Sequence, residues 1–153
     1  MKIRNSVKAI IIKEENLLTI KKVSGDQEFY ILPGGGQEHG ETLEIALKRE
    51  CVEEVNTDVE VGNLIFMREY IGKNHEFSEK HRHVHQIEFM FHCKINEWAN
   101  VKIGVNPDQD QVGVEWLPIK ELYKFDLYPK EIRSRIIGFF QGIENNVYLG
   151  DIN

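Results

Sequence analysis

Three glutamates in one short segment, Glu50, Glu53 and Glu54, have types and a spacing that suit joint chemistry. If the segment is helical, with about 100° of rotation per residue, the three carboxylates share one arc of about 100°. Like charges four residues apart destabilise a helix by about 0.2–0.5 kcal/mol, so this face gives folding no benefit. A hard divalent cation such as Mg²⁺ takes oxygen ligands and turns the same carboxylates into a binding site.

The residues before these glutamates add to that interpretation. Arg49 can pair its guanidinium with Glu50 or with Glu53 and so fix the orientation of a carboxylate. A solvated acidic helix face with one salt bridge is the ordinary alternative. The glycine run at 34–36, which permits close approach of the backbone, and Glu41 between that run and the helix both favour a functional site.

Six residues of this region share the spacing of a known pattern. They are Gly35, Glu41, Arg49, Glu50, Glu53 and Glu54, and they fit the Nudix box, G-x5-E-x7-R-E-U-x-E-E-x-G-U, in which U is a bulky apolar residue. With each residue type at roughly 7% frequency, such a match has chance odds on the order of 10⁻⁵ over the chain. The chain therefore resembles the Nudix hydrolase family.

Three positions depart from the box. Cys51 is a small apolar substitute, Asn56 stands where the family has glycine, and Thr57 replaces an apolar residue. Because asparagine tolerates the left-handed turn that glycine would supply, we expect a modest loss of stability and no loss of chemistry. The flanks agree with the family, since Leu32–Gly36 resembles its usual lead-in and Glu115–Leu122 its usual late strand and helix.

The resemblance implies an α/β fold, the Nudix-type α/β/α sandwich with a mixed β-sheet, in one domain over residues 1–153. It also implies an enzyme, a pyrophosphohydrolase that directs water at a phosphorus of a nucleoside diphosphate linked to another moiety. A Nudix-fold module that binds a nucleotide or regulates without catalysis is the alternative. The complete set of Arg49, Glu50, Glu53 and Glu54 argues against that alternative, because a pure binder has no use for all four.

The resemblance also implies roles for individual residues. The implied catalytic residues are Arg49, Glu50 and Glu53. The implied ligands of Mg²⁺, or of Mn²⁺, are Glu50, Glu53, Glu54 and the Gly34 carbonyl, and Asp110 is the positional candidate for a ligand outside the box, with Asp108 and Glu88 behind it. Glu50 is either a third ligand or the general base, and Gly35 and Glu41 have structural roles in the motif.

The side chains that bind substrate are less constrained by the pattern. Candidates for contact with phosphate or base are Arg4, Arg68, Tyr70, Arg82, His83 and His85. His81, His83 and His85 alternate, so a strand would put them on one face. They are open to three interpretations: an exposed strand end, a phosphate-binding group together with Arg82, or a metal site, for which neighbouring thiols are absent.

The hydrophobic pattern predicts the elements that position these residues. Strands are predicted over residues 3–13, 17–20, 29–32, 59–71, 84–95 and 112–117. A helix is predicted over 42–55 with Thr42 as its N-cap, a stripe at every fourth residue from Leu43 to Val55, and Asn56 as its end. Short helices are predicted from Pro118 to Leu122 and from Pro129 to about Phe140. Polar loops are predicted over 72–83 and 106–111, and nothing is assigned from 142 onward.

Composition limits the classes of partner. The formal net charge of the 153 residues is −6, which disfavours nucleic-acid polymers and anionic membranes. Glu41 to Glu54 alone carries five acidic and two basic residues, so half of that charge surrounds the predicted metal site. The expected partner is a small anionic nucleotide-type substrate, and a homodimer is possible. Cys51 and Cys93 are expected as buried reduced thiols, and the absence of a signal or membrane segment predicts a cytoplasmic location.

Overall fold

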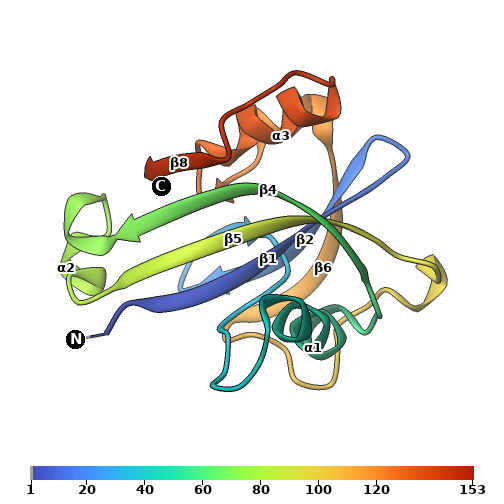
Figure 1. Ribbon diagram of the computed structural model, residues 1–153, viewed down its shortest axis with the longest axis horizontal. Coiled ribbons are helices and arrows are strands. Elements are labelled where there is room, and N and C mark those ends of the chain that lie inside the picture. Colours follow the sequence, from blue (N-terminus) through green and yellow to red (C-terminus); the bar gives the residue numbers. More distant parts are fainter. Residues whose placement is uncertain (1) are drawn as a thin grey trace.

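The computed structural model describes residues 2–153, which form a curled mixed β-sheet with helices on both faces (Figure 1). The strands are β1 Arg4–Lys13, β2 Asn16–Ser24, β3 Gln27–Ile31, β4 Glu60–Ile71, β5 His85–Lys94, β6 Gln111–Pro118, β7 Leu127–Tyr128 and β8 Tyr148–Asp151. The helices are α1 Leu43–Val55, α2 Ser78–His81 and α3 Ile132–Phe140, with 3-10 turns η1 Gly72–Asn74, η2 Trp98–Asn100 and η3 Ile119–Lys124. The predicted mixed α/β fold is confirmed.

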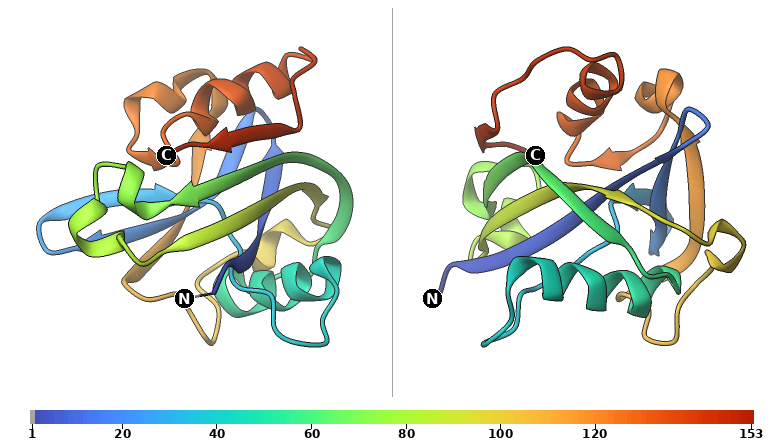
Figure 2. Two further views of the ribbon diagram at one scale, coloured as in Figure 1. Left: turned by 60° about the vertical axis from the view of Figure 1, so that its left-hand side comes forward. Right: turned by 45° about the vertical axis from the view of Figure 1, so that its right-hand side comes forward.

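The order of strands in the sheet is β7-β3-β2-β1-β5-β4-β8, and β6 pairs with β2. β1 and β5 run parallel, in a register from Arg4 opposite Gln86 to Ile11 opposite Cys93. β1 joins β2 only through its last two residues, in a tight antiparallel hairpin. The sheet therefore curls at this junction, and Figure 2 shows the curled sheet from two further sides.

Helix α1 covers one face of the sheet. Its buried residues Leu47, Cys51 and Val55 pack on the odd-numbered positions of β1, which include Val7 and Ala9. Thr42 caps the helix by accepting a hydrogen bond from the Ile45 N–H, and Asn56 ends it in the left-handed region at φ 55°. The predicted helix, its N-cap and its left-handed end are thus confirmed.

Helix α3 and the turn η3 cover the opposite face. Ile132 and Ile136 of α3 pack in a second core cluster with Ile10 of β1, Phe66 of β4 and Met90 of β5. The central strands β1, β4 and β5 therefore serve both cores by alternation of their side chains. No helix within residues 2–153 has both the length and the apolar character needed to cross a membrane.

Three parts of the structure differ from the sequence predictions. The loop predicted at 72–83 contains η1 and α2, which are too short to leave a periodic pattern. The unassigned tail forms β8, which pairs in parallel with the edge of β4. Helix α3 begins at Ile132, and Pro129 lies in the preceding turn, where its carbonyl accepts the Ile132 N–H at 3.0 Å.

The three alternating histidines, His81, His83 and His85, do not lie on one strand. His81 is the last residue of α2, His83 lies in a turn, and His85 begins β5. The three histidines therefore do not share one face of a strand. Within residues 2–153, moreover, no group of three or more His, Cys, Asp or Glu side chains stands close enough together to hold a metal ion.

Candidate active site

The glycine loop lies directly on β1. The Val7 N–H donates to the Gly35 carbonyl at 2.9 Å, and the Ala9 N–H donates to the Pro33 carbonyl at 2.9 Å. Gly34 has φ 133°, and a Cβ at this position would stand 2.0 Å from the Val7 carbonyl oxygen. Only glycine fits there, so the sequence forces the loop backbone against the strand at the N-terminal side of α1.

Arg49 organises the first turns of the site. Its Nε donates to Glu41 Oε1 at 2.7 Å, and its Nη2 donates to Glu41 Oε2 at 2.9 Å and to the Gly36 carbonyl at 3.0 Å. Its Nη1 donates to Glu50 Oε1 at 2.9 Å. The hydrogen bonds from Arg49, followed by one from the Glu38 N–H, lower the pKa of Glu41 to about 2. Loop and helix are thus tied by one guanidinium fork.

Glu50 and Glu53 both lie near Nη1 of Arg49. A Cβ on Gly35 would stand 2.6 Å from the carboxyl carbon of Glu50, so the absence of a side chain at Gly35 makes room for this carboxylate. Glu53 Oε2 lies 3.5 Å from Arg49 Nη1, and its side chain is 29% exposed. Glu53 is therefore the more accessible of the two to a ligand from solvent.

Glu54 is the buried member of the three, with 3% of its surface exposed. Its Oε2 accepts the Gly34 N–H at 2.8 Å. Burial raises its pKa to about 7, and the positive charge of Lys8 together with the Gly34 N–H offsets part of that rise. The Lys8 ammonium in turn donates to the Gly34 carbonyl at 2.8 Å.

The donor set fits a hard divalent cation by its chemistry, although within residues 2–153 the three carboxylates as placed are not gathered closely enough to hold one. Three carboxylates and the Gly34 carbonyl are all oxygen donors on one loop and one helix face, which are the ligands that Mg²⁺ takes in proteins. The empty space above Gly35 is filled by Glu50, one of these donors. As placed, Glu50 and Glu53 contact Arg49, and the Gly34 carbonyl contacts Lys8.

The acidic loop before β6 also reaches this region. Asp108 is close enough to Glu54 to contribute to the raised pKa of that carboxyl, and it bonds Lys22 at 2.9 Å. Asp110 has φ 63°, and its carbonyl accepts the Val23 N–H at 3.1 Å. Asp108 is therefore the acidic residue of this loop whose charge affects the pKa of Glu54. The role of Asp110 as a metal ligand stays a prediction.

A cavity of about 460 Å³ is lined by residues of β2, β3, β4, β5 and the segment before β5. The three glutamates of α1 are not among its lining residues, but it adjoins a smaller cavity that Lys8 lines. The lining of the larger cavity includes four aromatic rings from four segments, those of Phe29, Tyr70, Phe77 and Tyr128. Its lining also includes the cationic side chains Lys22, Arg68 and Lys80. Rings that stack on a base and cations that attract phosphate are the lining a nucleotide requires.

The predicted substrate-binding residues are not all brought together by the structure. Arg68, Tyr70 and His81 line the cavity, and the Tyr70 hydroxyl shares a hydrogen bond with His81 Nδ1 at 2.8 Å. The Arg4 guanidinium lies over Gly36, beside the glycine loop. His85 Nε2 lies 3.3 Å from Glu69 Oε1, whereas Arg82 and His83 are exposed and do not line this cavity.

Sequence reasoning missed one charged residue of this region and gave another only a reserve place. Glu88, considered only as a reserve metal ligand, is 3% exposed and accepts a hydrogen bond from Arg68 Nε. Lys8 was not considered at all. The signal was present in both cases, because each is a charged residue at a position where an apolar strand would bury its side chain.

Comparisons with known proteins agree with this geometry. The family model described as NUDIX domain matches residues 2–136. The chain belongs to the NUDIX domain family. It is thus a Nudix hydrolase, as the sequence predicted. No curated protein matches the chain.

Solved structures share the fold of this Nudix hydrolase. A NUDIX hydrolase from Nitrosomonas europaea is 21% identical with a TM-score of 0.75, and the match covers 100% of this chain and 80% of that one. A UDP-X diphosphatase is 19% identical with a TM-score of 0.71, over 99% and 68%. An ADP-ribose pyrophosphatase from Streptococcus suis is 16% identical with a TM-score of 0.63, over 97% and 98%.

Proposed function

We propose that this Nudix hydrolase cleaves, with Mg²⁺ or Mn²⁺, the diphosphate of a nucleoside diphosphate linked to another moiety. The observation that carries the proposal is the guanidinium fork of Arg49, which holds Glu41, the Gly36 carbonyl and Glu50 together. A fork that ties the glycine loop to the carboxylate face serves to fix ligands, and simple helix stability does not require it.

The chain's own residues would share the work as follows. Glu53, Glu54 and the Gly34 carbonyl are the proposed ligands of the cation, and Glu50 is a third ligand or the base that takes a proton from water. Arg49 positions Glu50 through its hydrogen bond. The bound cation supplies positive charge on phosphoryl oxygens and lowers the pKa of water.

The cavity of about 460 Å³ would take one end of the substrate. Its aromatic lining suits a planar base, and Arg68 and Lys80 suit an anionic group. The structural neighbours include a UDP-X diphosphatase and an ADP-ribose pyrophosphatase, which suggests the compounds to test first.

The test is release of phosphate, after coupled phosphatase treatment, from nucleotide sugars, ADP-ribose, nucleoside triphosphates and dinucleoside polyphosphates. We expect at least one to be cleaved with Mg²⁺ or Mn²⁺. Glu53→Gln should lower kcat by at least about 10²-fold, the range for loss of a main catalytic group. The matched control is Glu44→Gln, because Glu44 lies on the same helix but pairs with Lys48 at 3.0 Å.

Two outcomes would contradict this. A Glu53→Gln variant as active as the wild type would show that Glu53 is not a required ligand of the cation. Absence of cleavage across the whole panel, with nucleotide binding retained, would instead favour a Nudix-fold binding module.

A further inference from the structure

Lys8 lies between the carboxylate face and the cavity. Its ammonium donates to the Gly34 carbonyl at 2.8 Å and to the Leu32 carbonyl at 3.3 Å. Within residues 2–153 it makes no ion pair closer than 4.0 Å. An ammonium has three donors, so two carbonyls leave one N–H for a further partner.

The open side of Lys8 is the cavity side. A small cavity of about 80 Å³ is lined by Lys8 together with Glu88 and Arg68. It shares Ile31, Arg68 and Tyr128 with the cavity of about 460 Å³, so the two adjoin. An anionic group at the inner end of the larger cavity would therefore come within reach of this lysine.

Two buried carboxylates flank Lys8. Glu54 lies on the side of α1 and Glu88 on the side of the cavity, and the charge of Lys8 lowers the pKa of both. Each has a closer partner of its own, since Glu54 accepts the Gly34 N–H and Glu88 accepts from Arg68. The strongest direct bonds of Lys8 therefore remain those to the loop carbonyls, one of which is the proposed cation ligand.

We propose that Lys8 is a substrate-binding residue that competes with the divalent cation for the Gly34 carbonyl and, once the cation is bound, holds the diphosphate. The inference rests on the proposed function, which supplies both the cation and the diphosphate. Two positive charges in contact with one carbonyl repel each other strongly in a partly buried site. A diphosphate offers the displaced ammonium several charge-assisted hydrogen bonds in exchange.

The first test measures Mn²⁺ affinity in the absence of substrate, from the electron paramagnetic resonance signal of free Mn²⁺. Lys8→Met removes the competing ammonium, so we expect the Kd for Mn²⁺ to fall by about 3-fold or more. Lys2→Met is the matched control, because it removes the same charge from an exposed position on the same segment, and its Kd should not change. A Kd for Lys8→Met that is unchanged or higher would overturn the competition.

The second test measures binding of methylenediphosphonate, a diphosphate that cannot be hydrolysed, by calorimetry at saturating Mn²⁺. Loss of a charge-assisted hydrogen bond should raise its Kd about 10-fold or more in Lys8→Met. An affinity equal to that of the wild type would overturn the role in binding. Lys8→Gln keeps a donor for the Gly34 carbonyl without the charge, and it replaces Lys8→Met in both tests if circular dichroism shows that variant to be unfolded.

Neither measurement depends on turnover. If the substrate panel fails while both affinities change as expected, the proposed hydrolysis is wrong and the role of Lys8 stands. If the panel succeeds while both affinities stay unchanged, the hydrolysis stands and the role of Lys8 is wrong.

Discussion

Gly35 and Glu50 show how one missing side chain shapes the site. The carboxylate of Glu50 occupies the volume that a Cβ at Gly35 would fill, and Arg49 holds it there. Glycine is required here for space, whereas at Gly34 it is required for both space and a left-handed φ. The two neighbouring glycines are therefore required for different reasons, Gly35 for space alone and Gly34 for space and backbone conformation.

Substituting Gly35 tests this demand alone. In Gly35→Ala the new methyl group would stand 2.6 Å from the Glu50 carboxylate, so Glu50 must leave its bond with Arg49. We expect kcat to fall by about 10²-fold with little change in Tm, measured by the coupled assay and by circular dichroism. Gly113→Ala is the control, because its methyl group would meet Lys21 only at an ordinary distance of 3.7 Å. Wild-type kcat in Gly35→Ala would show that Glu50 works from another position.

At the residue scale, the box was predictable because its members are close in sequence and fixed in spacing. The partners of Glu54 and Arg68 were not, because they come from distant segments. Lys8 reaches Gly34 from β1, and Glu88 meets Arg68 through the pairing of β5 with β4. A pattern along one segment carries no information about such partners.

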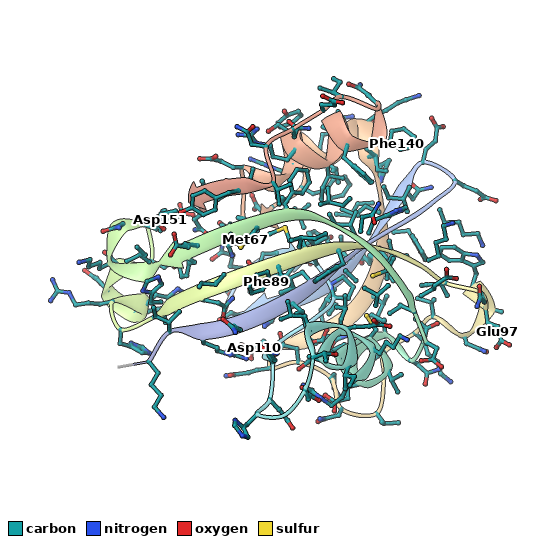
Figure 3. All side chains as sticks on the ribbon, viewed as in Figure 1. Met67, Phe89, Glu97, Asp110, Phe140 and Asp151 are labelled. Carbon is teal, nitrogen blue, oxygen red and sulfur yellow. The ribbon has the colours of Figure 1, made fainter. Side chains whose placement is uncertain are left out.

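At the element scale, β8 fastens the polar loop that precedes β5. Asp151 accepts the Ile71 N–H at 2.9 Å, Asn74 Nδ2 at 2.8 Å and a 2.6 Å bond from His75 Nε2. Figure 3 shows Asp151 at the end of the sheet where η1 and α2 lie. The loop carries Phe77 and His81 of the cavity, so β8 helps to position a cavity wall.

This docking should depend on pH in the acid range. Burial opposes ionisation of Asp151, but the bonds from Asn74, His75 and the Ile71 N–H outweigh it and lower its pKa below 3.8. The stabilisation is therefore fully present above about pH 3.8 and is lost as pH falls through the lower folded value. We expect the Ile71 amide resonance to titrate below pH 3.8 in NMR spectra.

Removing the charge should have the matching effect at neutral pH. Asp151→Asn should lower Tm at pH 7 by about 2–4 °C, the shift expected for about 1 kcal/mol in a chain of this size, and the difference from wild type should shrink as the pH falls below 3.8. Asp26→Asn, in an exposed turn, should leave Tm unchanged. A difference in Tm that persists in acid would mean that the charge of Asp151 is not what docks β8.

Helices and strands could be predicted from the sequence where their own residues carry a clear hydrophobic period and end signals. Helix α1 has a cap at Thr42, a four-residue apolar repeat and a left-handed asparagine, and each of these signals lies within the segment. Strand β8 has four residues that include Gly150, and its place depends on β4, which lies far earlier in the chain. Whether such a short segment forms a strand depends on its pairing with a distant strand, and the strand preference of its own residues is not enough to predict it.

At the scale of the whole molecule, two core layers share one sheet. Cys51 on α1 and Cys93 on β5 are buried in the same layer, from opposite sides of the packing between helix and sheet. Burial raises the pKa of Cys93 to about 12, with a small opposing effect of the Gly62 N–H, and burial also raises that of Cys51. Both thiols should therefore be unreactive while this layer is closed.

We expect an aromatic disulfide reagent at pH 8 to react with neither thiol in the native protein on a timescale of minutes. In denaturant both should react within seconds. At intermediate denaturant the two should react together, because exposure of either requires α1 to leave the sheet. Rapid reaction of one cysteine in the native protein would show that the layer opens locally.

The parallel pairing of β1 with β5 has a consequence for synthesis on the ribosome. Arg4 pairs with Gln86 and Ile11 pairs with Cys93, so the central ladder cannot close until β5 has been synthesised. Leu17 pairs with Leu117 of β6, which is synthesised later still. At about 5–20 residues per second, β1 spends several seconds with one edge unpaired. The nascent chain therefore carries the acidic helix α1 before the sheet that supports it, and a chaperone that shields β1 would act in that interval.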